Sequence, residues 1–356
     1  MSQHQSHFLN ACERLVDNLS KDAVLPEQLG VVIIGRNEGQ LLRRALASVG
    51  AEAGAVVYVD SASTDDSVEI VRRYFPDAVI VELSADEPLS PARGRNAGFA
   101  ALRERLPRLR YVQFVDGDCE LHPSWLRAAS HHLHHNPQVG VLAGRLRERD
   151  RERNPYHRLA DMEWDQPAGE VEETGGIMMV RAQAWEAAGG QNADMPAAEE
   201  RELCLRVSAA GYSIVRLADD MAQHDIDMDQ LRQWWTRSVR MGHAYAQGLW
   251  IHRDRYHLRR VVSLLAYGVA LPSAALAGAV PTLGLSLGLL GRYGHLWRKI
   301  EQERRGRGDR ADDARLYATA NVVNKVAGAV GVARFFTRTL REGRGGRRAR
   351  VSATPR

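Results

Sequence analysis

The sequence predicts an α/β fold, a Rossmann-like mixed sheet with helices on both faces, followed by a helical C-terminal region. Early in the chain, short β-branched segments alternate with stretches whose apolar residues recur at helical spacing. Strands and helices of these lengths favour parallel pairing through right-handed crossovers. Later, residues 261–291 contain no charged side chain. An apolar helical segment is therefore expected after the sheet.

The elements follow in order along the chain. Residues 1–28 have only a weak helical stripe that Pro26 ends, so we expect a peripheral extension there. Residues 31–34 form the first predicted strand, and Asn37 can cap the helix that follows over 41–49. Further strands are predicted at 56–59, 78–83, 111–115 and 212–217. Ser63 or Thr64 can cap a helix whose Val68, Val71 and Phe75 face inward. Two more helices are predicted over 92–106 and near 314–340.

Composition limits the function classes. The chain of 356 residues is 44% hydrophobic, which suffices for a core and for two domains. Its net charge of +4 is small, but arginines crowd the C-terminal half, which favours an anionic surface as neighbour; no nucleic-acid partner is expected. Three scattered cysteines fit a reducing compartment, and no secretory signal is visible. We therefore expect a cytosolic catalytic portion.

Two carboxylates end the predicted strand at 111–115. Asp116 and Asp118 are separated by Gly117, which allows a sharp turn. In open α/β sheets ligands lie beyond the carboxyl ends of strands, so both side chains are expected in a crevice. Mg²⁺ typically takes one or two protein carboxylates and shares its other positions with water and ligand phosphates. An ordinary acidic turn is the alternative for an isolated Asp-Gly-Asp.

Polar residues also follow the first two predicted strands, where the topology places ligands. A carboxylate such as Asp60 can accept from a base N–H or a ribose hydroxyl, while arginines at a helix start can neutralise phosphate. Neither GxGxxG nor GxxxxGK[ST] is present, so neither a dinucleotide fold nor a P-loop is supported. Each arginine could instead be a solvated surface residue. The nucleotide-binding candidates are Gly35, Arg36, Asn37, Glu38, Asp60, Ser61, Arg93, Arg95 and Asp116.

Four short motifs, in this order and spacing, resemble those of the family 2 glycosyltransferases, which have the GT-A fold. The resemblance runs from about residue 31 to residue 242. Gly35-Arg36 stands where Pro-Thr-aromatic is commoner, and Ala62 replaces a usual glycine. The motifs are residues 31–38, residues 59–65, Asp116-Gly117-Asp118, and the segments 175–181, 189–190 and 199–206.

The resemblance implies a nucleotide-diphosphate sugar donor, a saccharide or lipid-linked acceptor, an inverting reaction and a divalent metal, Mn²⁺ or Mg²⁺. It implies Gly175 and Gly176 in the acceptor loop and His224 as a third metal ligand beside Asp116 and Asp118; imidazole suits Mn²⁺. Sugar transfer also needs a base, for which we favour Glu200, with Glu199 as rival. Alternatively, these glutamates line an exposed first helical turn, where negative charge is favourable.

Residues 233–240 resemble, with altered order, a motif that follows the base helix in family members with polymeric or lipid-linked acceptors. Trp234 or Trp235 could stack on a sugar while Arg237 meets diphosphate. Packing of both tryptophans in a core is the equal alternative. The departure from the motif is large enough that no processive polymerase is inferred.

The charge-free segment from Val261 to Gly291 is long enough to cross a bilayer. Pro272 and Pro281 divide it, and arginines flank both ends, so a re-entrant or tight helical hairpin with both ends cytoplasmic satisfies the charges better than a single crossing. A buried hairpin in a soluble domain is the alternative. The basic C-terminal tail could contact anionic lipid.

Together these observations predict a metal-dependent glycosyltransferase at the cytoplasmic face of the cell membrane, acting on a lipid-linked or envelope saccharide. The alternatives are a sugar-phosphate nucleotidyltransferase, for which Gly35-Arg36 is a poor phosphate loop, a soluble cytoplasmic enzyme, and a catalytically silent membrane scaffold. The predicted divisions are an extension over 1–28, a catalytic domain over 29–245, a helical region over 246–340 and a basic tail over 341–356.

Overall fold

The computed structural model describes residues 24–195 and 197–343, so the predicted extension up to residue 23 and most of the basic tail lie outside the described residues. The chain divides into two compact units. The first contains the residues up to Arg147 together with Gln166–Ala193 and Glu200–Asp225. The second contains Glu148–Asp165, Asp194–Glu199 and the residues from Ile226 onward. The predicted domain limits stay a prediction.

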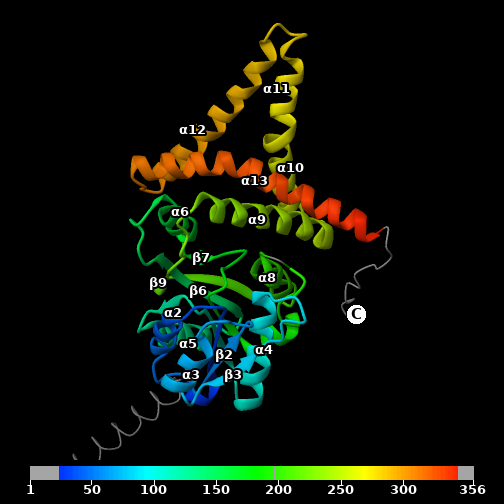
Figure 1. Cartoon of the computed structure of the whole chain (residues 1–356). Coiled ribbons are helices and arrows are strands. Elements are labelled where there is room, and N and C mark those ends of the chain that lie inside the picture. Colours follow the sequence, from blue (N-terminus) through cyan, green and yellow to red (C-terminus); the bar gives the residue numbers. More distant parts are fainter. Residues whose placement is uncertain (1–23, 196, 344–356) are drawn as a thin grey trace, which may run out of the picture. The chain divides into compact units, whose positions relative to one another are not determined.

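A mixed sheet of nine strands organises the first unit within the described residues (Figure 1). Its main path runs β3-β2-β1-β4-β8-β6-β9-β5, with β7 paired to β9. The four strands predicted from the N-terminal part pair in parallel, and β8 then joins β4 in antiparallel orientation. The strands are β1 (Leu29–Gly35), β2 (Ala55–Asp60), β3 (Val79–Glu82), β4 (Tyr111–Asp116), β5 (Cys119–Leu121), β6 (Val139–Glu148), β7 (Gly169–Glu170), β8 (Met178–Arg181) and β9 (Ser213–His224).

Helices cover both faces of this sheet, which confirms the predicted α/β class. Alternate residues of a strand point to opposite faces, so Val31 and Ile33 pack in one core while Val32 and Ile34 pack in the other. One core is shared with α2 (Gln40–Ala47), α3 (Ser67–Tyr74) and α5 (Trp125–His135), and the other with α4 (Pro91–Arg105), α7 (Ala182–Ala188) and α8 (Glu199–Ala209).

Local details differ from the prediction in three places. Asn37 does not cap α2, whose N-cap residue is Gly39, and Ser63 and Thr64 do not cap α3, whose N-cap residue is Asp66. Both predicted caps instead tie the two loops together, because Asn37 Oδ1 accepts from Thr64 N at 2.7 Å. The predicted strand at 212–217 continues to His224 as β9, since pairing with β5 extends it.

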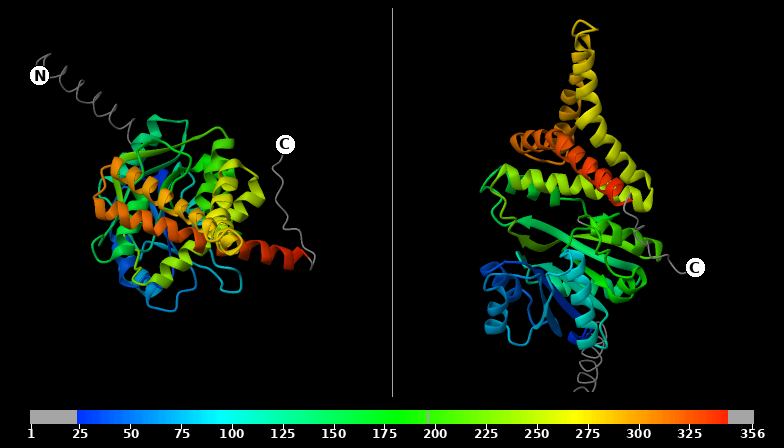
Figure 2. Two further views of the ribbon diagram at one scale, coloured as in Figure 1. Left: turned by 90° about the horizontal axis from the view of Figure 1, so that it is seen from above. Right: turned by 45° about the vertical axis from the view of Figure 1, so that its right-hand side comes forward.

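The second unit is helical in its described part. The long helix α9 (Leu231–His252) packs on α13 (Ala311–Gly343), and a hairpin extends from this pair (Figure 2). Small residues allow the close crossing: a Cβ on Gly242 of α9 would overlap the backbone of Gly328 on α13. The remaining elements of the unit are α6 (Pro155–Trp164), α10 (Arg255–Leu265), a π-helical turn η2 (Ala266–Ala270), α11 (Leu271–Ala279), a 3-10 helix η3 (Leu285–Leu290) and α12 (Gly291–Gly306).

We expect Gly242→Ala to lower the free energy of unfolding by about 2 kcal/mol, because the added methyl meets backbone that cannot rotate away as a side chain can. Gly294→Ala is the matched control, since Gly294 is also helical and a Cβ there meets nothing within 4 Å. That change should be neutral or stabilising. Denaturant unfolding measures both, and equal effects of the two changes would show that the α9–α13 crossing is not tight.

The charge-free segment forms a helical hairpin, as one of the sequence alternatives predicts. Pro272, however, does not divide it: α10, η2 and α11 run on as one helical stretch, and Pro272 lies in the first turn of α11, directly after the π-helical turn. Proline lacks the N–H and displaces the carbonyl four residues earlier, and a π-turn absorbs that mismatch. Arg255–Ala279 is the one helix in the described residues long and apolar enough to cross a membrane.

Candidate active site

Three loops meet at one edge of the parallel strands. In the register of the sheet, Gly35 at the end of β1 lies opposite Asp60 at the end of β2, and Ile34 lies opposite Asp116 at the end of β4. Gly35 O accepts from Ser61 N at 2.9 Å and Ile34 O accepts from Gly117 N at 2.8 Å. The sheet therefore brings the predicted loops together at its carboxyl edge, where α/β folds bind ligands.

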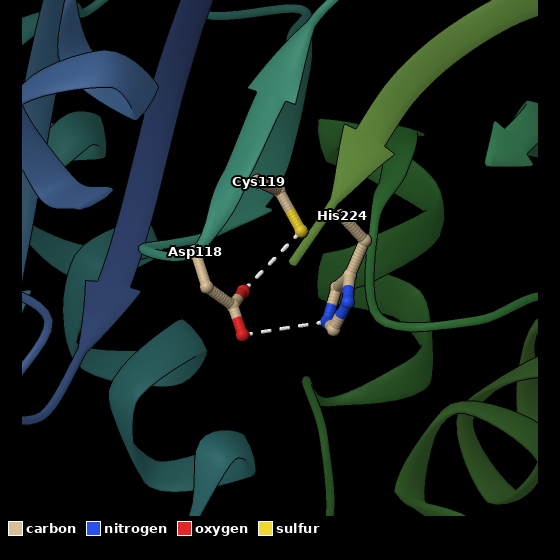
Figure 3. A group of neighbouring side chains, drawn as sticks. All are labelled: Asp118, Cys119 and His224. Atoms are coloured by element: carbon tan, nitrogen blue, oxygen red, sulfur yellow. Dashed lines mark hydrogen bonds and ion pairs between the residues drawn. The ribbon is translucent and has the colours of Figure 1, made fainter. Parts of the chain in front are cut away.

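Asp118 and His224 form the centre of the site (Figure 3). Asp118 precedes β5 and His224 ends β9, and the pairing of Cys119 with His224 in the two strands brings their side chains together. His224 Nε2 lies 3.4 Å from Asp118 Oδ2, and Cys119 Sγ donates to Asp118 Oδ1 at 3.3 Å. One donor atom from each of the three residues lies within 4.8 Å of the others, so the group could hold a metal ion.

Arg95 links the other half of the Asp-x-Asp motif to the predicted base. Its Nη2 donates to Asp116 Oδ1 at 2.9 Å and its Nη1 donates to Glu200 Oε1 at 3.3 Å. The Arg95 side chain is only 2% exposed, whereas Glu200 keeps 18% of its side-chain surface accessible. Asp116 is thus held by a guanidinium, and Asp118 is the carboxylate that faces the histidine.

Gly176 makes room for this arrangement. A Cβ at this position would overlap Arg95 Nη2 and would lie 3.1 Å from Glu200 Oε1. The glycine predicted for the acceptor loop therefore borders the Arg95–Glu200 pair. Gly175 is exposed and a Cβ there would meet nothing within 4 Å.

Glu38 adds a third carboxylate to the cluster. A Cβ on Gly117 would lie 2.8 Å from Glu38 Cγ, so this side chain packs against the turn between the two aspartates. Burial, and next the negative charge of Asp118, raise the pKa of Glu38 to about 7. Burial also raises the pKa of Asp118, while His224 opposes the shift. Protonation of these groups relieves a density of negative charge that a bound cation would also relieve.

The loop after β2 is fixed by hydrogen bonds of the buried Asp60 side chain. Asp60 is 3% exposed; its Oδ1 accepts from Tyr58 OH at 2.9 Å and its Oδ2 from Ser63 N at 2.8 Å. Ala62, between these anchors, has a φ of 59°. This left-handed conformation explains why a glycine is usual here in the resembled family.

Ala62→Gly is expected to raise the free energy of unfolding by about 0.5 to 1 kcal/mol, because it removes the steric cost of a Cβ at positive φ. The greater entropy of a glycine in the unfolded chain offsets part of this gain. Ala62→Val is the control, since a β-branched side chain tolerates this conformation still less. Thermal unfolding of the three proteins checks the order glycine, alanine, valine; a glycine variant less stable than the wild type would contradict it.

The structure places the remaining predicted residues in varied surroundings. Arg93 binds its own loop, through Glu87 at 2.9 Å and Ser84 O at 3.0 Å. Arg36 is exposed and Ser61 half-buried. Glu199 is buried, so the alternative of an exposed glutamate-lined turn does not hold for it.

In the second unit Trp234 packs with Leu159 and Met228, Trp235 lies beside them, and Arg237 pairs with Glu163 at 2.6 Å. These contacts fit the alternative of core packing.

Two residues at the site escaped the sequence reasoning. Cys119 joins the Asp118–His224 pair only because β5 pairs with β9, and Gln191 Oε1 accepts from Arg95 Nη1 at 3.4 Å from a loop after α7. Burial and the adjacent Asp118 raise the pKa of the Cys119 thiol well above its usual value, so it stays protonated and is a poor ligand. No sequence spacing points to either contact.

A sheet of four parallel strands extended by antiparallel ones, with Asp-x-Asp at the end of β4 and a histidine at the end of β9, is the arrangement of the GT-A fold. Residues 30–184 match the family model described as Glycosyl transferase family 2. This segment of the chain is therefore similar to the family 2 glycosyltransferases. No curated protein sequence matches the chain.

Solved structures share the fold. The mannosyltransferase PcManGT from Pyrobaculum calidifontis, in complex with GDP-Man and Mn²⁺, aligns with a TM-score of 0.56 and 19% identity over 88% of each chain. GalNAc-T7 with UDP, GalNAc and Mn²⁺ aligns with a TM-score of 0.50 and 12% identity over 68% of this chain and 51% of that one. At these identities the likeness establishes the GT-A fold alone.

Proposed function

We propose that the protein transfers a sugar from a nucleotide-diphosphate donor to a hydroxyl of a lipid-linked or envelope saccharide, with inversion and with a divalent metal. The observation that supports this best is the Arg95 bridge between Asp116 and Glu200, next to the Asp118–His224 pair. This bridge joins one carboxylate of the Asp-x-Asp motif to the candidate base at the carboxyl edge of the sheet. PcManGT and GalNAc-T7 were solved with nucleotides and Mn²⁺, which supports the same assignment.

The residues present fit a divalent ion. Asp118 and His224 supply a hard oxygen and an imidazole nitrogen, a mixed set that suits Mn²⁺. Burial first, and neighbouring carboxylates after it, raise the pKa values of Asp118 and Glu38, so a bound cation would stabilise both carboxylates. When bound, the ion would supply positive charge to the departing diphosphate. Asp116 would contribute through its Oδ2, because its Oδ1 accepts from Arg95.

The chain's own groups then perform the proton transfer. The acceptor oxygen attacks the anomeric carbon as the bond from that carbon to the diphosphate oxygen breaks, and the bonding electrons leave with the diphosphate. The acceptor proton moves to Glu200, whose Oε1 accepts from Arg95 Nη1 and whose side chain keeps 18% of its surface exposed. A single displacement of this kind inverts the configuration. Gly176 allows Arg95 to lie beside Glu200, because a Cβ at this position would overlap Arg95 Nη2.

The function is tested by following donor turnover in the purified protein. A thermal-shift panel of nucleotide diphosphates, with and without Mn²⁺, identifies the base, because a ligand bound only by the folded state raises the melting temperature. Transfer from the matching nucleotide sugar to an envelope saccharide or lipid-linked acceptor is then measured. Formation of a nucleotide sugar from a sugar phosphate would instead establish the nucleotidyltransferase, and absence of any turnover with bound donor would establish the silent scaffold.

Metal affinity should fall as pH decreases from about 8 to about 6, by up to roughly tenfold per pH unit for each proton displaced, because the ion competes with the proton on Glu38, whose pKa is raised to about 7. In the absence of metal, pH has the opposite effect on folding stability: Glu38 stabilises the folded state more at low pH than at high pH. The pKa of Glu38 rises from 4.5 to about 7 on folding, so its contribution is present below pH 4.5 and is lost as pH rises to about 7. Calorimetric titration with Mn²⁺ checks the first effect; a Glu38→Gln variant with an unchanged pH slope would contradict it.

A further inference from the structure

The hairpin of the second unit ends in an exposed apolar apex, which we define as residues 268–290. The stretch contains no charged residue, and the side chains nearest the turn are almost fully exposed, with Leu283 at 94%, Val280 at 86% and Leu285 at 83%. The two hydroxyls nearest the turn are satisfied from within the hairpin: Thr282 Oγ1 donates to Gly278 O at 2.6 Å and Ser286 Oγ to Ala275 O at 2.7 Å. The apex therefore presents large apolar side chains and no unpaired Thr282 or Ser286 hydroxyl, as an environment without water requires.

At one position along the hairpin, the residues of both arms change from aliphatic side chains to tyrosines. Tyr267 on the first arm and Tyr293 on the second contact each other, with ring centroids 5.7 Å apart and Tyr293 OH donating to Tyr267 O. Next to this pair, Arg292 begins an exposed basic stretch along α12 that includes His295, Arg298 and Lys299. Tyrosines followed by basic residues mark the level at which membrane proteins leave the hydrocarbon.

The charge distribution also limits the depth. An α-helical rise of about 1.5 Å per residue gives roughly 18 Å from Gly268 to Val280. The 3-10 rise of about 2 Å per residue gives roughly 14 Å for the return from Leu285 to Arg292. The hydrocarbon core of a bilayer is about 30 Å thick. A hairpin that crossed it would bury Arg292 and the basic residues after it in hydrocarbon, where a charged side chain is strongly unfavourable.

We propose that the apex inserts into one leaflet of an anionic bilayer without crossing it, with Tyr267 and Tyr293 at the interface and Arg292, Arg298 and Lys299 among the lipid phosphates. The helix Arg255–Ala279 is long and apolar enough to cross a membrane. The return arm is too short in its apolar part for the hairpin to span the bilayer. The basic residues that follow the apex on α12 favour lipid over a protein partner, because exposed leucines next to positive charge match an acyl layer beneath anionic headgroups. The proposal extends the proposed function by holding the enzyme where lipid-linked acceptors are.

Flotation of the full-length protein with vesicles tests the insertion, and needs neither donor nor metal, so it can fail independently of the proposed chemistry. Wild-type protein should float with phosphatidylglycerol-containing vesicles and weakly with phosphatidylcholine alone. The double change Leu283→Ser and Leu285→Ser should lower partition at least tenfold, whereas Leu25→Ser and Leu231→Ser, at leucines 43% and 60% exposed outside the hairpin, should not. Arg292→Gln should lower partition about fivefold on anionic vesicles only.

Depth is tested with a single cysteine at the turn. Leu283→Cys is introduced with Cys12→Ser, leaving Cys119 and Cys204, which are buried. On vesicles, a polarity-sensitive dye at residue 283 should brighten and resist aqueous iodide, and a membrane-impermeant maleimide sealed inside the vesicles should not label the cysteine. Labelling from inside would overturn the proposal in favour of a spanning hairpin. Absence of flotation, with a dimer that the Leu283 and Leu285 changes dissociate, would overturn it in favour of a protein contact.

Discussion

Glu200→Gln is expected to lower the rate constant for sugar transfer by about a hundredfold to ten-thousandfold, the usual contribution of a positioned general base. Glutamine keeps the shape of the side chain, and its Oε1 can still accept from Arg95 Nη1, now 3.3 Å from Glu200. The amide cannot take the acceptor proton at neutral pH. The loss should therefore appear in kcat, with donor affinity nearly unchanged.

Glu199→Gln is the matched control. Glu199 precedes Glu200 in the same helix and is 3% exposed, so a substrate hydroxyl has little access to it. Steady-state rates with saturating donor and acceptor, together with donor affinity by thermal shift, separate the two residues. If Glu199→Gln abolished transfer while Glu200→Gln stayed within tenfold of wild type, the roles assigned to the pair would have to be exchanged.

The sheet could be predicted from the sequence because its strands are encoded locally. Residues 31–34, 56–59 and 111–115 are short, apolar and bounded by polar turns, and the structure extends each by only a few residues. The antiparallel part was harder to predict, since β5 and β9 are defined by their pairing across a long sequence separation. That pairing decides the position of His224, which the resemblance could name and local pattern could not.

Arg95 shows a similar limit. Its place at the start of a helix suggested a phosphate contact or a solvated position, yet it is buried between Asp116 and Glu200. Sequence reasoning tests one segment at a time, whereas this ion-pair network joins α4, β4 and α8. The same holds for the raised pKa of Glu38, which depends on burial and on a neighbouring charge from another strand end.

Asp118→Asn is expected to lower Mn²⁺ affinity at least a hundredfold and the transfer rate by about a hundredfold to a thousandfold, the loss typical when one charge-stabilising group is removed. Asparagine preserves the volume and one acceptor oxygen, but it removes the negative charge beside His224 Nε2, 3.4 Å from Asp118 Oδ2. Asp116 Oδ2 is already assigned to the ion and Asp116 Oδ1 accepts from Arg95, so Asp116 cannot supply a second oxygen without giving up that hydrogen bond.

Cys119→Ala separates ligation from packing in this prediction. The thiol touches Asp118 and is buried, but its raised pKa keeps it protonated, so its removal should change Mn²⁺ affinity less than about threefold. Titration of Mn²⁺ by calorimetry and of transfer rate against Mn²⁺ concentration measures both variants. High Mn²⁺ should partly restore activity to Asp118→Asn if the residue acts through the ion. A variant that binds Mn²⁺ normally yet transfers no sugar would place Asp118 on the substrate instead, and an equal loss in Cys119→Ala would make the thiol a ligand.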